Sequence, residues 1–148
     1  LGAGGVTPSI VYALLKKGIK KIFISNRTLK KAENIKKRFP LIKIIDWKNI
    51  EIEIEYMDIV INATSLGLKG ENNFQQEFNN IKPNLVYYDV IYNPNETTMI
   101  KKFNKRGVKT FNGLEMFICQ GQKSFCLWNN INPEPDEILK ETLVKKLR

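Results

Sequence analysis

The sequence predicts an α/β fold built on a mostly parallel, doubly wound sheet. Short apolar runs typical of strands alternate with helix-patterned segments along the whole chain. A glycine-rich loop at the start leads directly into the first helical pattern, and polar residues follow several of the apolar runs. With 148 residues, 43% of them hydrophobic, the chain is long enough for one domain with a sizeable core. We therefore treat residues 1–148 as a single domain.

The first half of the chain alternates helix and strand twice. Residues 6–17 carry a helical stripe of apolar side chains that ends at a glycine, and residues 21–25 then predict a short buried strand. The very basic segment 28–39 has apolar residues on one side and a proline as its stop, which predicts a helix. Residues 41–45 are the next strand candidate. Residues 46–57 are ambiguous, because isoleucine and glutamate alternate there as in a strand although the connection should be helical.

The second half repeats the pattern. Residues 58–62 and 85–89 are apolar runs typical of buried strands, and a polar loop at 67–76 lies between them. A helix at 97–106 and a short strand at 108–111 follow. This alternation is what predicts parallel strands joined by helical connections.

The C-terminal part predicts two helices. The first spans residues 114–128, and Asp136 can cap the second, which runs toward the end of the chain. We expect residues 129–148 to be a linker and a helix that pack toward a domain outside this chain. The expected core stripe of the long helix consists of Leu114, Phe117, Ile118, Phe125 and Trp128.

Composition narrows the classes of function. The net charge of +9 comes from Lys and Arg scattered over every segment, which favours a solvated surface over a nucleic-acid interface and also suits a polyanionic cofactor. No apolar run approaches the length of a membrane span. Cys119 and Cys126 lie two helical turns apart, too far for a disulfide, which indicates a reduced, cytoplasmic protein. The chain has no histidine, so we expect no histidine-ligated metal.

Residues 1–9 form a glycine-rich loop that leads into the first predicted helix. Glycines let a ligand approach the backbone, and the first N–H groups of a helix have no partner within the helix. Together these features favour a phosphate or pyrophosphate site, although an ordinary turn uses the same residues. In a doubly wound sheet such a loop follows a central strand. Because the sequence opens at Leu1, we expect it to be the later part of a longer protein and the sheet to lack its first strand.

The residues after the second apolar run, Asn26, Arg27 and Thr28, lie about 20 residues beyond the glycines. An acid at this place would hold the ribose 2′-hydroxyl of NAD, whereas an arginine accommodates the 2′-phosphate of NADP. Here there is no acid, Arg27 can bind phosphate with two hydrogen bonds, and Lys31 adds charge one turn later. The motif favours NADP over the alternative, a helix cap beside a solvated arginine.

Other polar residues follow the later strand-like runs. Asn62 and Thr64 can line the ribose and nicotinamide side of a cofactor, although a simple turn uses the same residue types. Tyr92 is placed where a phenol can hydrogen-bond a small polar substrate, or it is a packed tyrosine. Gly113 permits close backbone approach, and Gln120 is either a site residue or a surface glutamine.

Taken in order, these motifs resemble one family. The series Gly-Ala-Gly-Gly, Asn-Arg-Thr, Asn-Ala-Thr-Ser, Asp-x-x-Tyr-Asn-Pro and Asn-Gly-Leu-x-Met-x-x-x-Gln is similar to the C-terminal, Rossmann-type NADP-binding domain of shikimate dehydrogenase, from Gly2 to about Trp128. The resemblance implies four groups of site residues. These are Gly2, Ala3, Gly4, Gly5 and Val6 around the cofactor phosphates; Asn26, Arg27, Thr28 and Lys31 at the 2′-phosphate; Val90 and Gly113 at the nicotinamide end; and Tyr92 and Gln120 at the substrate.

The resemblance also implies a reaction, the reversible NADPH-dependent reduction of 3-dehydroshikimate to shikimate in aromatic amino-acid (chorismate) biosynthesis. The family's catalytic Lys and Asp lie in an N-terminal substrate domain, so we expect no catalytic residue in this chain and no turnover by it alone. The partner implied is a small-molecule substrate, and the oligomeric state, a homodimer included, stays open. Two alternatives remain: another NADP-dependent oxidoreductase domain, such as that of glutamyl-tRNA reductase, and a non-catalytic NADP-binding module.

Overall fold

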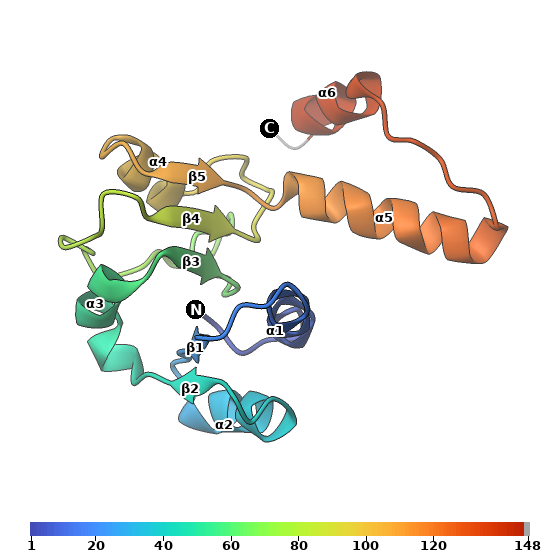
Figure 1. Ribbon diagram of the computed structural model, residues 1–148. Coiled ribbons are helices and arrows are strands. Elements are labelled where there is room, and N and C mark those ends of the chain that lie inside the picture. The colour runs from blue at the N-terminus through green and yellow to red at the C-terminus, as the bar shows by residue number, and fades with distance from the viewer. Residues whose placement is uncertain (147–148) are drawn as a thin grey trace.

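The computed structural model describes residues 1–146, in which helices and parallel strands alternate as predicted (Figure 1). The α/β class is therefore confirmed. The helices are α1 (Thr7–Lys16), α2 (Leu29–Arg38), α3 (Ile50–Glu53), α4 (Thr98–Asn104), α5 (Leu114–Asn129) and α6 (Glu137–Lys146), with 3₁₀ turns η1 (Trp47–Asn49) and η2 (Ile54–Tyr56) flanking α3. The strands are β1 (Phe23–Ile24), β2 (Lys43–Ile44), β3 (Ile59–Asn62), β4 (Val86–Asp89) and β5 (Lys109–Phe111).

The ambiguous segment 46–57 is helical, in three short consecutive turns. Ile50 and Ile54, four residues apart, are both buried, whereas Ile52 between them is 65% exposed. In a strand the three isoleucines would share one face, but in a helix only residues three or four apart do. The connection is therefore helical, as expected between two parallel strands, and the alternation of isoleucine and glutamate does not mark a strand.

The strands fall into two parallel sheets, β1–β2 and β3–β4–β5, where the sequence predicted one. The two sheets are joined at one end by the first two residues. The N-terminal amino group of Leu1 donates to the carbonyl oxygen of Ile61 (2.6 Å), and the carbonyl oxygen of Leu1 accepts from the backbone N–H of Ala63 (2.7 Å). Gly2 donates its backbone N–H to the carbonyl oxygen of Ser25 (2.8 Å). Residues 1–2 thus lie between β1 and β3 in the order expected of a doubly wound sheet (Figure 1).

Beyond residues 1–2, the facing edges of β1 and β3 form no strand pair within the described part of the chain. An apolar cavity of about 290 Å³ lies between them, with Ile22 and Ile24 lining one side and Val60 the other. Two residues are too few to bridge the full length of both strands, and this is why one predicted sheet appears as two.

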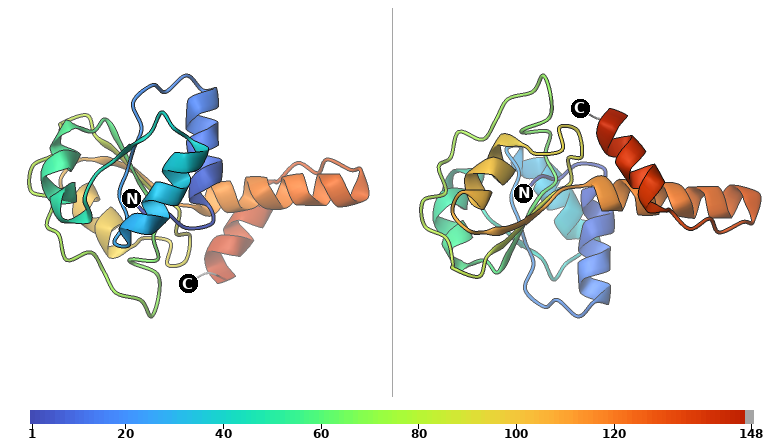
Figure 2. Two further views of the ribbon diagram at one scale, coloured as in Figure 1. Left: turned by 90° about the horizontal axis from the view of Figure 1, so that it is seen from below. Right: turned by 90° about the horizontal axis from the view of Figure 1, so that it is seen from above.

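Helices cover both sides of the strands. In both views of Figure 2, α1 and α2 lie to one side and α3 and α4 to the other. The buried apolar residues form two clusters accordingly. One joins β1 and β2 to α1 and α2, and it consists of Val11, Ile22, Ile24, Ala32, Ile35 and Ile42. The other lies around β3, β4, α3 and α4, and it includes Ile50, Ile54, Val60, Phe78, Leu85, Tyr87, Ile100 and Phe103.

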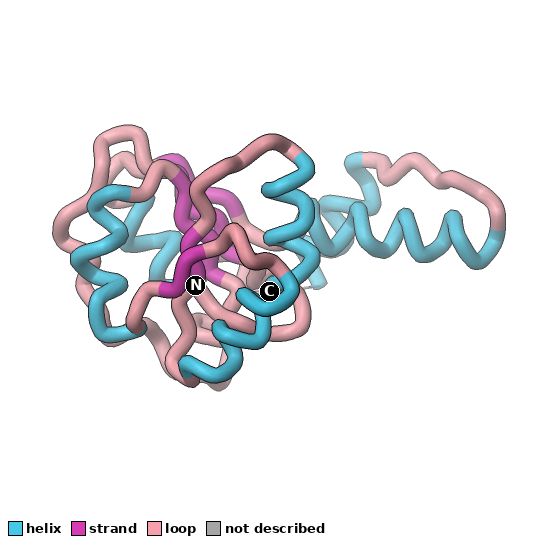
Figure 3. The backbone as a smooth tube through the Cα atoms, turned by 60° about the horizontal axis from the view of Figure 1, so that its bottom comes forward, coloured by secondary structure: helices cyan, strands magenta, loops and turns pink. Residues whose placement is uncertain are grey.

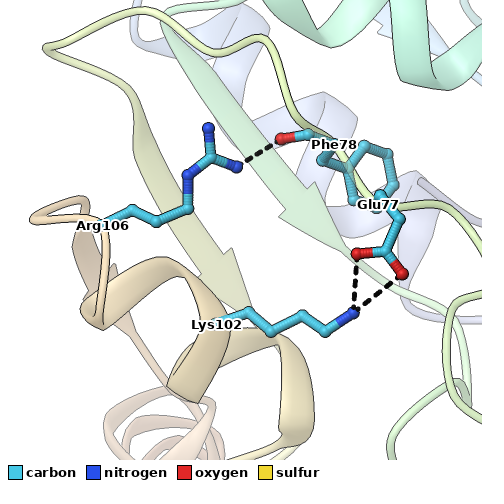
Figure 4. A network of polar contacts seen from close by, with 4 residues as sticks. All are labelled: Glu77, Phe78, Lys102 and Arg106. Carbon is cyan, nitrogen blue, oxygen red and sulfur yellow. Dashed lines mark hydrogen bonds and ion pairs between the residues drawn. The ribbon is translucent and has the colours of Figure 1, made fainter.

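The long connection between β3 and β4 is anchored by aromatic residues, although the sequence marks it as polar. Phe74 and Phe78 are buried in it, and Phe78 has a φ of 50°. The guanidinium of Arg106 donates to the carbonyl oxygen of Phe78, and Lys102 pairs with Glu77 at 3.4 Å (Figure 4). Residues just after α4 and within it therefore hold this loop against the body.

Helix α5 projects from the body, and the loop after it turns back (Figure 3), so that Lys140 of α6 pairs with Glu115 near the start of α5 at 3.3 Å. The expected core stripe of α5 is wrong beyond its first turns: Leu114 and Ile118 are buried, but Phe125 and Trp128 are exposed, Trp128 by 82%. The reason is that α5 leaves the body after Ile118, so nothing within residues 1–146 covers its far end. As expected, Asp136 caps the last helix, because its Oδ1 accepts the backbone N–H of Leu139 at 2.8 Å.

No helix within the described part of the chain combines the length and the hydropathy needed to cross a membrane.

Candidate functional site

Five loops meet at the carboxyl ends of the parallel strands, where doubly wound sheets bind their ligands. They are residues 2–6 before α1, residues 25–28 after β1, residues 63–66 after β3, residues 90–92 after β4, and residues 112–113 before α5. Hydrogen bonds and close backbone contacts join neighbouring loops to one another.

Residues 2–6, the glycine loop, pack against the loop after β3. Gly2 has a φ of +98°, and a Cβ added to it would lie 2.5 Å from the carbonyl oxygen of Ala63. A side chain is therefore excluded at Gly2 by both conformation and space. Thr7 closes the loop from inside, since its buried hydroxyl donates to the carbonyl oxygen of Gly2 at 3.3 Å.

The other side of the glycine loop is open. A Cβ at Gly5 would meet nothing within 4 Å. Within residues 1–146, the backbone N–H groups of Gly4, Gly5 and Val6 have no hydrogen-bond partner, and they lie at the N-terminus of the ten-residue helix α1. Free N–H groups and the positive end of the helix dipole favour an anion here, so the loop fits the phosphates of a dinucleotide.

Asn26 ties the loop after β1 to the glycine loop. Its Oδ1 accepts the backbone N–H of Ala3 at 3.0 Å, and its Nδ2 donates to the carbonyl oxygen of Thr28 at 2.9 Å. One amide hydrogen of Asn26 remains for a ligand. Arg27, Thr28 and Lys31 are exposed, and no acidic side chain occurs in the segment 25–31. The loop therefore presents positive charge and hydrogen-bond donors beside the phosphate-binding segment.

A buried polar network connects the ends of β3 and β4. Asp89 is 0% exposed and accepts four hydrogen bonds. Burial raises the pKa of Asp89, and the donors around it act in the opposite direction. Asn62, also 0% exposed, uses its whole carboxamide within the protein: Nδ2 donates to Asp89 and to the carbonyl oxygen of Leu66, while Oδ1 accepts the N–H and the hydroxyl of Thr64. Asn62 therefore shapes the loop after β3 from inside.

Gly113 brings the start of α5 against the loop after β4. A Cβ added to Gly113 would lie 2.0 Å from the carbonyl oxygen of Val90, and the N–H of Gly113 donates to the carbonyl oxygen of Ile91 at 3.0 Å. The close backbone approach expected of this glycine is confirmed by this geometry.

Tyr92 and Gln120 meet at one residue of α5. The ring of Tyr92 stacks on that of Phe117, with 4.4 Å between the ring centroids, and Nε2 of the exposed Gln120 donates to the carbonyl oxygen of Phe117 at 3.0 Å. Both predicted substrate residues thus contact Phe117 of α5. Their contact with a substrate stays a prediction.

Sequence reasoning missed Asp89 and Thr97 as parts of the site's framework. The signal was present, because Asp89 is an acid at the end of an apolar strand, and an acid in that place must find donors when it is buried. Thr97 Oγ1 supplies one of them at 2.9 Å and also accepts the N–H of Ile100, capping α4.

Comparison with known proteins finds a matching family and relatives named shikimate dehydrogenase. The profile of the family described as Shikimate / quinate 5-dehydrogenase matches residues 1–110. A shikimate dehydrogenase (NADP(+)) of Pelagibacter ubique is 49% identical over 136 residues, which cover 92% of this chain and 50% of that protein.

Solved structures agree. The crystal structure of shikimate dehydrogenase from Aquifex aeolicus superimposes with a TM-score of 0.83 at 34% identity, covering 96% of this chain and 51% of that one. Quinate dehydrogenase from Corynebacterium glutamicum, solved in complex with NAD, gives a TM-score of 0.86 at 27% identity, covering 97% of this chain and 53% of that one. The chain thus spans about half the length of the relatives that it matches.

Proposed function

Because this chain belongs to the shikimate / quinate 5-dehydrogenase family, we propose that it forms the cofactor-binding part of an NADP-dependent shikimate dehydrogenase. The reaction is the reversible reduction of 3-dehydroshikimate to shikimate. The observation that carries the proposal is the glycine loop. Three of its N–H groups, at the start of α1, have no partner within residues 1–146, and Asn26 ties the loop to a basic segment without acids.

The chain's own residues bind and orient the cofactor. The N–H groups of Gly4, Gly5 and Val6 hold its pyrophosphate, which the helix dipole also favours. Arg27 and Lys31, together with the Asn26 amide and the Thr28 hydroxyl, hold the 2′-phosphate of NADP, because a guanidinium matches a phosphate with two hydrogen bonds. NADPH, when bound, supplies the hydride.

The nicotinamide end of the cofactor lies, in this proposal, against the backbone of Val90 and Gly113. The absence of a Cβ at Gly113 lets the two segments close on each other and leaves backbone surface facing the site. Asn62 and Thr64 contribute from the β3 side by holding the loop that backs the ribose and nicotinamide, and only Thr64 of the two has exposed surface.

Tyr92 and Gln120 bind the substrate's hydroxyls or carboxylate. Tyr92 offers a phenol whose ring is fixed by Phe117, and Gln120 offers an amide one turn further along α5. In this proposal both side chains bind the substrate, and neither is assigned a proton transfer. We propose that the catalytic Lys and Asp are supplied by the half of the relatives' length that this chain does not cover.

The exposed apolar side chains of α5 and α6 support the presence of such a second half, because they offer a surface on which it can pack. Trp128, Leu127 and Ile138 are 82%, 72% and 74% exposed. We propose that residues 129–148, with the end of α5, pack against that other half. The free thiols of Cys119 and Cys126 suit a reducing compartment, so we propose a cytoplasmic location.

A chimaera tests the proposed function. The N-terminal half of the Pelagibacter ubique relative, joined in register to residues 1–148, is expected to oxidise shikimate with NADP, whereas the 148-residue chain alone binds NADP without turnover. A well-folded chimaera that binds NADP but leaves shikimate unchanged would contradict the assigned reaction. Turnover by the chain alone would show that its catalytic groups lie within it.

A further inference from the structure

Asp89 has no part in the chemistry proposed above, although the protein directs four hydrogen bonds onto it. Its Oδ1 accepts from Nδ2 of Asn62 and from the backbone N–H of Ile91, both at 3.1 Å. Its Oδ2 accepts from the hydroxyls of Thr97 at 2.9 Å and Tyr87 at 3.2 Å. Because Asp89 is 0% exposed, it cannot touch a ligand in this conformation and must act through these neighbours.

The two partners of Oδ1 lie at two different loops of the site: Asn62 is the last residue of β3, and Ile91 lies in the loop after β4. Asn62 continues into the loop after β3, where its own Oδ1 accepts the N–H and the hydroxyl of Thr64 at 3.0 and 2.6 Å. One carboxylate oxygen therefore holds both loops.

Each of these loops in turn backs one glycine of the cofactor site. Ala63 in the first loop leaves no room for a Cβ at Gly2, and Val90 in the second leaves none at Gly113. Gly2 begins the phosphate-binding segment, and Gly113 lies at the nicotinamide end. The position of one end of the site relative to the other thus depends on how these loops are joined, by the Oδ1 link and by the backbone N–H of Val90, which donates to the carbonyl oxygen of Asn62 at 3.0 Å.

We propose that Asp89 is a positioning residue for the dinucleotide: through Asn62 and the N–H of Ile91 it fixes the loop after β4 relative to the loop after β3, and so the nicotinamide end of the site relative to the phosphate end. This assignment rests on the proposed binding of NADP. Asp89 is then needed to bind the whole dinucleotide, which reaches both ends of the site. It is not needed to bind a ligand that occupies only the adenosine end.

The choice of variants follows from the four donors. Asp89→Ser shortens the side chain and leaves a small polar space that water can fill, so the link is lost while the donors stay solvated. Asp89→Asn is the conservative variant. Its oxygen can stay on Asn62 and Ile91, whose N–H groups can only donate, while its NH₂ faces the hydroxyls of Thr97 and Tyr87, which can accept.

Tyr87→Phe is the matched control. It removes one hydrogen bond to Oδ2 of the same carboxylate, keeps the ring that packs on Phe103 with 4.8 Å between centroids, and leaves both partners of Oδ1 in place. It is expected to lower the thermal midpoint without changing the Kd for NADP.

The experiment measures two dissociation constants for each variant by calorimetry, with thermal unfolding alongside. The ligands are NADP and adenosine 2′,5′-bisphosphate, which carries only the adenosine end with its two phosphates. For Asp89→Ser we expect the Kd for NADP to rise about tenfold, the equivalent of one lost hydrogen bond, and the Kd for the bisphosphate to stay unchanged. Asp89→Asn should restore NADP binding to near the original value.

Other outcomes overturn the proposal. If Asp89→Ser weakens both ligands equally, or neither, Asp89 only stabilises the fold. If Tyr87→Phe weakens NADP binding as much as Asp89→Ser does, the link through Oδ1 has no special role. If the unaltered chain binds neither NADP nor the bisphosphate, the result contradicts the proposed function itself and, with it, the role of Asp89. Should Asp89→Ser not fold, Asn62→Ser cuts the same link from the other side and is expected to show the same selective loss.

Discussion

Two glycines of the same loop should respond in opposite ways to the same added methyl group. At Gly2, alanine meets a φ of +98° and a carbonyl oxygen 2.5 Å from its Cβ. Such a backbone conformation costs a non-glycine residue about 1–3 kcal/mol, and forcing an atom into a filled space costs about 1–3 kcal/mol more. Gly2→Ala should therefore lose about 2–6 kcal/mol of a typical domain stability of about 5–15 kcal/mol.

At Gly5 the added Cβ meets nothing within 4 Å, and φ lies outside the left-handed region. Gly5→Ala should leave the free energy of unfolding within about 1 kcal/mol of the original value. The methyl group would, however, lie on the open side of the loop, where the proposed phosphates bind, and should weaken NADP binding. Gly5→Ala thus separates the cost to the fold from the cost to the ligand.

Urea unfolding followed by tryptophan fluorescence measures the first effect, because Trp47 stacks on Phe74 beside the core. Calorimetric titration with NADP measures the second. Equal loss of stability in Gly2→Ala and Gly5→Ala would refute the packing argument. Unchanged NADP affinity in Gly5→Ala would refute the placement of phosphates on the open side of the loop.

Three further results are expected. In the chimaera, Tyr92→Phe and Gln120→Ala should lower kcat/KM for shikimate with little change in NADP affinity; unaltered kinetics in both would leave them only a packing role. Arg106→Ala removes two charge-assisted hydrogen bonds to backbone carbonyls and should cost about 1.5–3 kcal/mol of stability. Lys102→Ala breaks an exposed ion pair and should cost under about 1 kcal/mol. Equal losses of stability in the two variants would contradict this reasoning. Burial raises the pKa of Asp89, so its contribution to stability is greatest below the ordinary value of 3.8 and falls as pH rises through the native pKa. The stability gap between the original chain and Asp89→Asn should therefore be smaller at pH 7 than in acid, and a gap independent of pH would argue against it.

Most of the fold follows from local patterns in the sequence. Apolar runs bounded by turn residues locate the five strands within the described residues 1–146. The reason is clearest for β3 and β4, the central parallel strands, because such strands are mostly apolar. The same reasoning stayed open at residues 46–57, where period two and period four both fit the isoleucines. Only the packing of Ile50 and Ile54 into the core decides between them.

The end of α5 shows why helical periodicity alone is not enough. Phe125 and Trp128 share a face with the buried Ile118, but they are exposed because the helix leaves the body after Ile118. An apolar stripe indicates that a face can be buried, and it does not say which partner buries it.

The candidate site was predictable as motifs but not as a network. The spacing from the glycine loop to Arg27 places two loops at the same edge of the sheet. The link from Asp89 to Asn62 joins residues 27 positions apart on neighbouring strands and depends on side-chain geometry that no local pattern carries.

Cofactor discrimination at Arg27 tests the central claim most directly. The dissociation constants of NADP and NAD are measured for the original chain, for Arg27→Ala, and for Arg38→Ala, which removes the same charge from the other end of α2, where the guanidinium lies 5.8 Å from the Phe39 ring centroid. We predict that Arg27→Ala weakens NADP binding about 10- to 100-fold and leaves NAD nearly unchanged, while Arg38→Ala changes neither. An equal loss for both cofactors, or the same loss in Arg38→Ala, would contradict recognition of the 2′-phosphate by Arg27.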